Sequence, residues 1–334
     1  MANIIEFKQT GGPEQLQIIE RPITPPAPDE VQVAIKAAGL NRAELLFLAG
    51  QYLVQPSLPS RIGLEASGVI KAVGENVDQF SVGQAASITP NLDPTQYGVL
   101  GEVVNVPVAA LQLKPESASF INAAAFWMAY PTAWGGLVQT GGLTANVGQN
   151  VLISAASSSV GIAAIQIAKA YGANVIATTR TAAKVDAIRS VGPDHIVVTD
   201  EEDLVERVQA ITNSEGFDIA FDPVGGPFVE ALATAAGREA IIVEYGLLSG
   251  EQAPLPFFTM VGKGLSIKAF HLVFDLLQHP DRLKIAIEHL LPRLEDGTYA
   301  PVIDQIYPLE KFQEAYQRLA SNQQFGKVVI EVTA

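Results

Sequence analysis

The stretch Val151-Leu-Ile-Ser-Ala-Ala-Ser-Ser-Ser-Val-Gly161 decides the fold, because it reads as a buried strand, a tight turn of small residues and the start of a helix. A dinucleotide-binding turn of this kind has the pattern G-x-G-x-x-G, which lets backbone N–H groups approach a pyrophosphate at the positive end of the helix. Ala156, Ser158 and Gly161 occupy the three pattern positions here. Small residues suit that role, but such a turn, taken alone, is more often plain packing between a strand and a helix.

The sequence after this turn alternates short apolar strands with helical patterns. A helix predicted over 162–171 is followed by a strand over 175–178, and the alternation continues to a strand over 240–243. This pattern predicts a parallel sheet with helices on both faces. Before the turn, short strands such as those over 31–37 and 69–73 are separated by Gly and Pro, which favours a compact β-rich barrel.

The C-terminal part differs from both. The segment 280–294 has the pattern of an amphipathic helix, in which Pro292 is expected to cause a break or a kink. A second helix is predicted over 308–319, and a last strand over 325–332. A chain of 334 residues is too long for one ordinary core, so two domains are expected.

The segment Thr178-Thr-Arg-Thr-Ala-Ala-Lys184 follows the second strand of the alternating region. An NAD site usually has an acid near the end of this strand to hold the ribose 2′-hydroxyl. No acid stands between Val175 and Val185, and Arg180 and Lys184 lie four residues apart. The two cations and the hydroxyl of Thr181 would suit a 2′-phosphate. The alternative is a solvated helix start with ordinary surface charges.

Composition restricts the partners and the chemistry. The net charge is −14, which disfavours nucleic acid and anionic membranes as partners. The chain has no cysteine, so disulfides, thiolate metal sites and a cysteine nucleophile are excluded. No apolar stretch reaches about 18 residues and no signal peptide is apparent. A cytoplasmic protein without a membrane segment is therefore expected.

Segments spread over nearly the whole chain resemble the medium-chain dehydrogenase/reductase superfamily, and within it the zinc-free quinone oxidoreductases similar to zeta-crystallin. They include Gly39-Leu-Asn-Arg-Ala-Glu44, Gly63-Leu-Glu-Ala-Ser-Gly68, Phe221-Asp-Pro-Val-Gly-Gly226 and Gly326-Lys-Val-Val329. The resemblance implies an α/β fold with a doubly wound Rossmann domain and a β-rich GroES-like barrel domain. The Rossmann domain, 125–270, would split the GroES-like domain into 1–124 and 271–334.

The resemblance also implies site residues. Asn41 and Tyr52 would face the nicotinamide and the substrate, as cofactor-binding and catalytic groups. The other cofactor-binding positions that it implies are Thr132, Ser158, Ser159, Val160, Arg180, Thr181, Lys184, Tyr245, Gly246, Phe270 and His271. Zinc-dependent relatives have Cys near the position of Asn41 and a Gly-His-Glu motif where this chain has Gly63-Leu-Glu65, so no metal is expected.

These residues predict an NADPH-dependent enzyme that passes a hydride to a quinone or another carbonyl-conjugated double bond. Tyr52 would donate a hydrogen bond or a proton to the developing oxyanion, or would only shape the pocket. Asn41 would bind ribose or substrate, or would only form a turn. An enoyl-thioester reductase and a non-catalytic NADPH-binding protein are the alternatives. A homodimer is expected by analogy with relatives.

Overall fold

The structure is a computed structural model that describes residues 1–333. The chain forms two compact units. Unit 1 contains Met1–Met128 and the chain from Glu288 onward, and unit 2 contains Ala129–Ile287. The division drawn from the sequence, at 124/125 and 270/271, differs mainly in the segment 271–287, which packs with unit 2.

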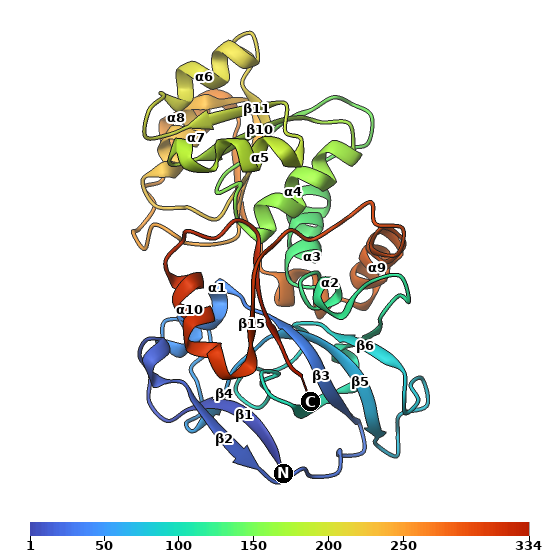
Figure 1. Ribbon diagram of the computed structural model, residues 1–334. Helices are drawn as coiled ribbons and strands as arrows, with labels where there is room; N and C mark the ends of the chain where they lie inside the picture. Colours follow the sequence, from blue (N-terminus) through green and yellow to red (C-terminus); the bar gives the residue numbers. More distant parts are fainter. Residues whose placement is uncertain (334) are drawn as a thin grey trace. The chain divides into compact units, whose positions relative to one another are not determined.

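Unit 2 is built on a six-stranded parallel sheet in the order β11-β10-β9-β12-β13-β14 (Figure 1). The strands are β9 (Asn150–Ile153), β10 (Asn174–Thr179), β11 (His195–Val198), β12 (Phe217–Asp222), β13 (Ala236–Glu244) and β14 (Ser266–Ala269). The chain runs outward from β9 to β11 and then returns to the other side of β9. The order therefore reverses between β9 and β12, as in a doubly wound dinucleotide-binding fold, and the predicted Rossmann sheet is confirmed.

Helices cover this sheet because each connection between parallel strands must cross one of its faces. Leu152, Ile176 and Ala220 join one apolar core with Val208 of α6 and Leu232 of α7. The helices of unit 2 are α3 (Ala129–Trp134), η3 (Gly135–Thr140), α4 (Ser159–Ala170), η4 (Ala182–Lys184), α5 (Val185–Val191), α6 (Leu204–Ile211), α7 (Phe228–Ala235), α8 (Phe257–Lys263) and η5 (Leu272–Leu277).

Unit 1 is the β-rich part that the sequence predicts. Its larger sheet has seven strands, with the path β15-β16-β3-β5-β6-β8 and β7 paired to β3, and its smaller sheet has the order β2-β1-β4. The strands are β1 (Ala2–Phe7), β2 (Gln17–Arg21), β3 (Glu30–Gly39), β4 (Ser60–Arg61), β5 (Glu65–Val73), β6 (Ala85–Ile88), β7 (Val103–Pro107), β8 (Leu111–Leu113), β15 (Ile303–Pro308) and β16 (Lys327–Glu331).

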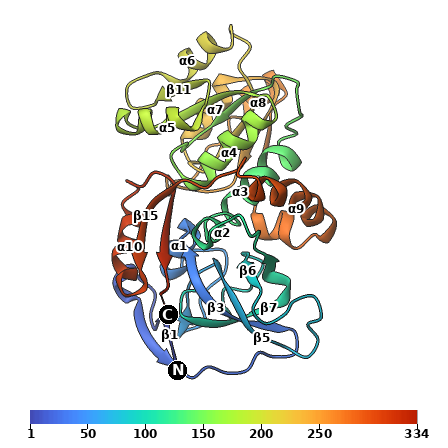
Figure 2. The same cartoon turned by 45° about the vertical axis from the view of Figure 1, so that its right-hand side comes forward.

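Unit 1 also contains several short helical segments. They are η1 (Pro13–Gln15), α1 (Arg42–Leu48), η2 (Val108–Ala110), α2 (Phe120–Ala124), η6 (Leu309–Lys311) and α10 (Phe312–Ala320). Helix α10 packs along β15 and β16 (Figure 2). Its buried face, including Phe312 and Tyr316, joins the apolar core that also contains Ile35 of β3.

Two predictions for the C-terminal part are wrong in detail. Of the two alternatives expected at Pro292, the break is wrong: helix α9 (Pro280–Glu295) continues through this proline, which lies in its last turn between the buried Leu290 and Leu294, while a kink stays a prediction. The helix predicted from Pro308 begins later, since Pro308 still pairs with Glu331 in the β15–β16 ladder. Among residues 1–333, no helix combines the length and the apolarity that crossing a membrane requires.

Candidate functional site

The turn between β9 and α4 is tightly wound. Ala155 has a positive φ of 45°, which costs a non-glycine residue about 1 kcal/mol or more. Ser158 caps α4, because its Oγ accepts a hydrogen bond of 3.0 Å from the Gly161 N–H. A Cβ added at Gly161 would lie 2.7 Å from the carbonyl oxygen of Ala155. The third position of the pattern thus requires glycine for close packing.

The loop after β10 meets this turn. Nζ of Lys184 donates a hydrogen bond of 3.3 Å to Oγ of Ser157. Because β9 and β10 are parallel neighbours, both loops lie at the carboxyl edge of the sheet, where dinucleotides bind in such folds. Arg180 is exposed, and within residues 1–333 no carboxylate lies within ion-pairing distance of it. The edge therefore carries two cations close to a helix N-terminus.

Further predicted cofactor positions lie in helix α3 and on loops of unit 2. The Tyr245 ring stacks on Phe221 with 4.0 Å between ring centroids, and burial raises the pKa of its hydroxyl well above the ordinary range. Thr132 is buried in α3, and Phe270 covers Gly135, where a Cβ would lie 2.5 Å from the phenyl ring. Whether these residues touch a cofactor stays a prediction.

The other positions have local roles as well. Nδ1 of His271 accepts a hydrogen bond of 3.3 Å from the Phe274 N–H, so this side chain caps η5. Burial lowers the pKa of His271, which favours the neutral ring. Gly246 and Thr181 are exposed, and Ser159 and Val160 are half-buried in the first turn of α4. These facts fit both a cofactor-binding role and a purely structural one.

A pair of carboxyl groups ends two neighbouring strands at the same edge. Asp222 of β12 accepts hydrogen bonds from the Ser154 hydroxyl and, at 2.7 Å, from the Gly225 N–H, so its carboxylate holds the turn that follows β12. Burial, with the charge of Asp222 second, raises the pKa of Glu244 on β13 to about 9. Glu244 therefore holds a proton at neutral pH. Sequence reasoning missed this pair, because an acid at the end of a strand gives no local signal.

The substitution Glu244→Gln is expected to stabilise unit 2 increasingly as pH rises. The pKa of Glu244 is about 9 in the folded protein, whereas its ordinary value is 4.5. Between these pH values the unfolded chain has lost the proton and must take it up again to fold, so the wild type loses stability as pH rises. The variant should match the wild type at the acidic end and unfold about 2 °C higher or more at pH 8. Thermal unfolding followed by circular dichroism from pH 5 to 8 measures this. Glu201→Gln, at an exposed position, is the control, and a pH-independent offset in Glu244→Gln would contradict the prediction.

In unit 1, Tyr52 follows α1 and packs against the apolar core. It lines a small pocket with Phe47, Leu64 and Tyr97, among other residues. Burial raises the pKa of its phenol, which therefore stays protonated at neutral pH. Tyr52 is thus available in the protonated form that a hydrogen-bond donor requires.

A buried polar cluster lies beside α1. Nζ of Lys327 pairs with Oε1 of Glu65 and donates a hydrogen bond of 2.5 Å to Oδ1 of Asn41. The Asn41 amide donates in turn to Glu44, at 3.0 Å, and Oε2 of Glu65 accepts a bond of 2.9 Å from the Met128 N–H. Both carboxylate oxygens of Glu65 are thus engaged within the fold. Asn41 is held at both ends of its side chain.

The cluster ends at a second carboxyl group. Glu44 accepts a hydrogen bond from the hydroxyl of Tyr316 on α10, and burial raises the pKa of Glu44 to about 7. Sequence reasoning missed both Glu44 and Lys327. The available signal was a lysine at the start of the run 327–330, whose other three residues are apolar. A charge at the buried end of such a strand indicates a buried partner.

Two family descriptions match the chain. Residues 159–290 match "Zinc-binding dehydrogenase", and residues 27–116 match "Alcohol dehydrogenase GroES-like domain". Together with the Rossmann sheet and its turn, they define an oxidoreductase of the class that uses a nicotinamide cofactor.

The relatives narrow the class. Quinone oxidoreductase 1 of Escherichia coli strain K12 is 30% identical over 99% of this chain and 99% of its own length. The structure of Escherichia coli quinone oxidoreductase complexed with NADPH has a TM-score of 0.89, 30% identity, and covers 99% of this chain and all of its own. A structure titled an NAD-dependent alcohol dehydrogenase has a TM-score of 0.89 and 31% identity, with full coverage of both chains. The chain belongs to the medium-chain dehydrogenase/reductase superfamily and, within it, to the quinone oxidoreductase-like family.

The first family description raises the question of zinc. Leu64 carries no donor atom, and both Asn41 and Glu65 are bonded to the ammonium group of Lys327. Within residues 1–333, no group of three or more His, Cys, Asp or Glu side chains is arranged to hold a metal ion. The residues at this place do not fit zinc, which prefers nitrogen and sulfur ligands in a tetrahedral set.

Proposed function

We propose that this chain is an NADPH-dependent, zinc-independent reductase that transfers a hydride to quinones or other carbonyl-conjugated double bonds. The observation that carries the proposal is the pair Arg180 and Lys184 at the carboxyl edge of the sheet, where an NAD site has an acid. Lys184 reaches Ser157 of the first turn, so the cation is near the place of the pyrophosphate. The similarity to Escherichia coli quinone oxidoreductases supports the substrate class.

The predicted site residues would have different roles. The N-terminus of α4 would hold the pyrophosphate, with Ser158, Ser159 and Val160, while Arg180, Thr181 and Lys184 would hold the 2′-phosphate. Thr132, Tyr245, Gly246, Phe270 and His271 would complete the cofactor contacts. Bound NADPH supplies the hydride. Tyr52 would donate a hydrogen bond to the substrate oxygen that gains negative charge, and Asn41, fixed by Lys327 and Glu44, would orient ribose or substrate.

Tyr52→Phe is expected to lower kcat/KM for an enone by about 10- to 100-fold, because the donor to the developing oxyanion is lost. The effect on a quinone should be smaller, since a quinone accepts the hydride more readily. Steady-state NADPH oxidation measures both. Tyr307→Phe, at a half-buried tyrosine of the same unit that lies outside the predicted site, is the control. Full activity of Tyr52→Phe on every enone tested would leave Tyr52 with a role in pocket shape only.

A screen of NADPH oxidation tests the function itself. The acceptors are p-benzoquinone, methyl vinyl ketone and crotonyl coenzyme A. A separate assay with ethanol and NAD⁺ tests whether the protein oxidises an alcohol instead. Turnover of the quinone or the enone is expected. Preference for the thioester would identify an enoyl-thioester reductase. Cofactor binding without turnover of any acceptor would indicate a non-catalytic NADPH-binding protein. Zinc-dependent oxidation of ethanol would contradict the proposal.

A homodimer is part of this proposal. Strand β14 is the last strand of the parallel sheet, and Leu255, Phe257, Phe258 and Val261, before and within α8, are exposed apolar residues of the same unit. An open edge beside exposed apolar side chains is typical of a self-complementary interface. The cytoplasmic location stays a prediction.

A further inference from the structure

Unit 1 contains a pocket of about 410 Å³ that none of the residues assigned above to cofactor or substrate lines. It lies where the small sheet, β2-β1-β4, meets β3 and β7. Its polar lining residues are Glu6, Arg21, Thr24, Glu30, Gln32, Arg61, Tyr97 and Asn105. A volume of this size is typical of a small-molecule site.

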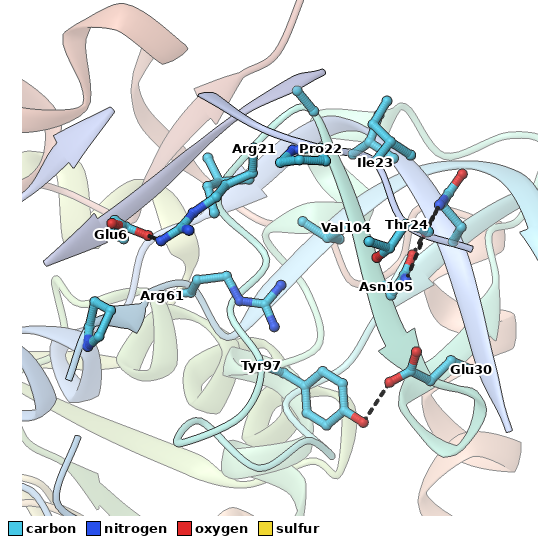
Figure 3. A pocket seen from close by; sticks show the side chains of 15 residues that line it. Glu6, Arg21, Pro22, Ile23, Thr24, Glu30, Arg61, Tyr97, Val104 and Asn105 are labelled. Atoms are coloured by element: carbon cyan, nitrogen blue, oxygen red, sulfur yellow. Dashed lines mark hydrogen bonds and ion pairs between the residues drawn. The ribbon is translucent and has the colours of Figure 1, made fainter. Parts of the chain in front are cut away.

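Arg61 of β4 points into this pocket, and Figure 3 shows its guanidinium group between the Glu6–Arg21 pair and Tyr97. Nη2 of this group donates a hydrogen bond of 2.6 Å to the carbonyl oxygen of Gln96. A guanidinium has five N–H donors, so most of its capacity is left over. Burial lowers the pKa of Arg61, which indicates that water only partly solvates this cation.

The two carboxylates of the pocket are already engaged. Glu6 pairs with Arg21 at 2.7 Å, and Glu30 accepts a bond of 2.9 Å from the Tyr97 hydroxyl and another of 2.9 Å from the Ala27 N–H. Over residues 1–333, no carboxylate oxygen lies within 4.0 Å of the Arg61 nitrogens. Arg61 therefore makes no direct ion pair within the described residues, although the negative charges of Glu30 and Glu6 act on it from a distance.

The wall opposite Arg61 is fixed and partly apolar. The side-chain amide of Gln32 donates a hydrogen bond of 2.8 Å to the carbonyl oxygen of Thr24, and the amide of Asn105 donates one of 3.2 Å to the same oxygen. These bonds hold the segment after β2 against β3 and β7. The neighbouring Ile23 and Val104 give this wall an apolar surface. An occupant would thus meet a charged centre and a preformed apolar side.

We propose that this pocket binds a small monocarboxylate with an apolar body, whose carboxylate takes the free donors of Arg61. The planar guanidinium matches a carboxylate in two parallel hydrogen bonds. Glu6 and Glu30 line the same pocket and repel any anion, a dianion about twice as strongly as a monoanion, so a phosphate dianion fits less well than a monocarboxylate. The inference goes beyond the proposed reductase activity and does not depend on it.

Isothermal titration of the full-length protein with benzoate tests the inference, with benzamide as the neutral molecule of the same shape. Benzoate is expected to bind with a dissociation constant of about 1 mM or below, and benzamide and inorganic phosphate at least about tenfold more weakly. Arg61→Gln should raise the dissociation constant for benzoate by at least about tenfold, while Arg61→Lys should lose only part of the affinity for benzoate. Arg238→Gln, an exposed arginine of unit 2, should leave it unchanged.

A second variant covers the case in which Arg61→Gln does not fold. Ile23 is 46% exposed at the pocket wall, so Ile23→Asp is tolerated by the fold and places a negative charge beside the site. Ile23→Asp should weaken the binding of benzoate and leave the binding of benzamide unchanged. Absence of benzoate binding to the wild type would overturn the proposal. Equal binding of benzoate and benzamide, or unchanged affinity in the folded Arg61→Gln or Ile23→Asp variant, would do so as well.

Discussion

Lys327→Met is expected to lower the free energy of unfolding by about 3–5 kcal/mol, because it leaves a buried carboxylate without its counter-charge. The side chain of Lys327 is 1% exposed and that of Glu65 is 0% exposed, so water cannot replace the lost ammonium group. Asn41 also loses the donor to its Oδ1, which adds the cost of an unpaired buried acceptor. Guanidinium-induced unfolding, followed by circular dichroism, measures the loss.

The double variant Lys327→Met with Glu65→Gln separates charge from shape. A glutamine keeps an oxygen that accepts the bond from the Met128 N–H, but it carries no charge to be compensated. The double variant should recover at least half of the lost stability. Lys71→Met, at an exposed position of β5, is the control for removing a lysine. If the double variant is no more stable than the single one, the ion pair is not the source of the effect.

The parts of the fold that the sequence predicts are those with local causes. Strands β9, β10 and β11 are apolar runs separated by helices, and a parallel sheet buried on both faces requires this pattern. Strand β1 was not predicted. It is buried at nearly every position and so lacks the alternation of a half-buried strand. Besides its ladder with the nearby β2, it pairs with β4, which lies more than fifty residues away and contributes only two residues to the ladder. Pairing of distant segments leaves no trace in a short window of sequence.

The candidate site divides in the same way. Arg180 and Lys184 could be predicted because the charge pattern lies within one loop, next to a strand whose end is recognisable. The partners Lys327 and Asn41 are 286 positions apart, so only the folded β3–β16 ladder brings them together. The protonated state of Glu244 depends on Asp222, which approaches through the β12–β13 pairing. Such pairs follow from topology rather than from residue types.

Arg180→Ala is expected to weaken NADPH binding by about 10- to 100-fold while NADH binding changes by less than about threefold. NADPH alone carries the 2′-phosphate, and a guanidinium can hold it in two charge-assisted bonds. Lys184→Ala should give a smaller loss for NADPH, because the ammonium group is a point charge that also bonds Ser157. Fluorescence titration with each cofactor at fixed ionic strength measures the four dissociation constants.

Arg180→Asp extends the same experiment and distinguishes a specific contact from a general field. The variant places an acid at the loop where NAD sites hold the ribose 2′-hydroxyl, so NADH should become the preferred cofactor. A general field from the added acid would weaken the binding of both cofactors, more for NADPH because of its extra phosphate charge, and would fade as ionic strength rises. A loss confined to NADPH therefore requires a direct contact with its phosphate. Equal losses for NADPH and NADH in Arg180→Ala would refute the assignment and favour a solvated loop.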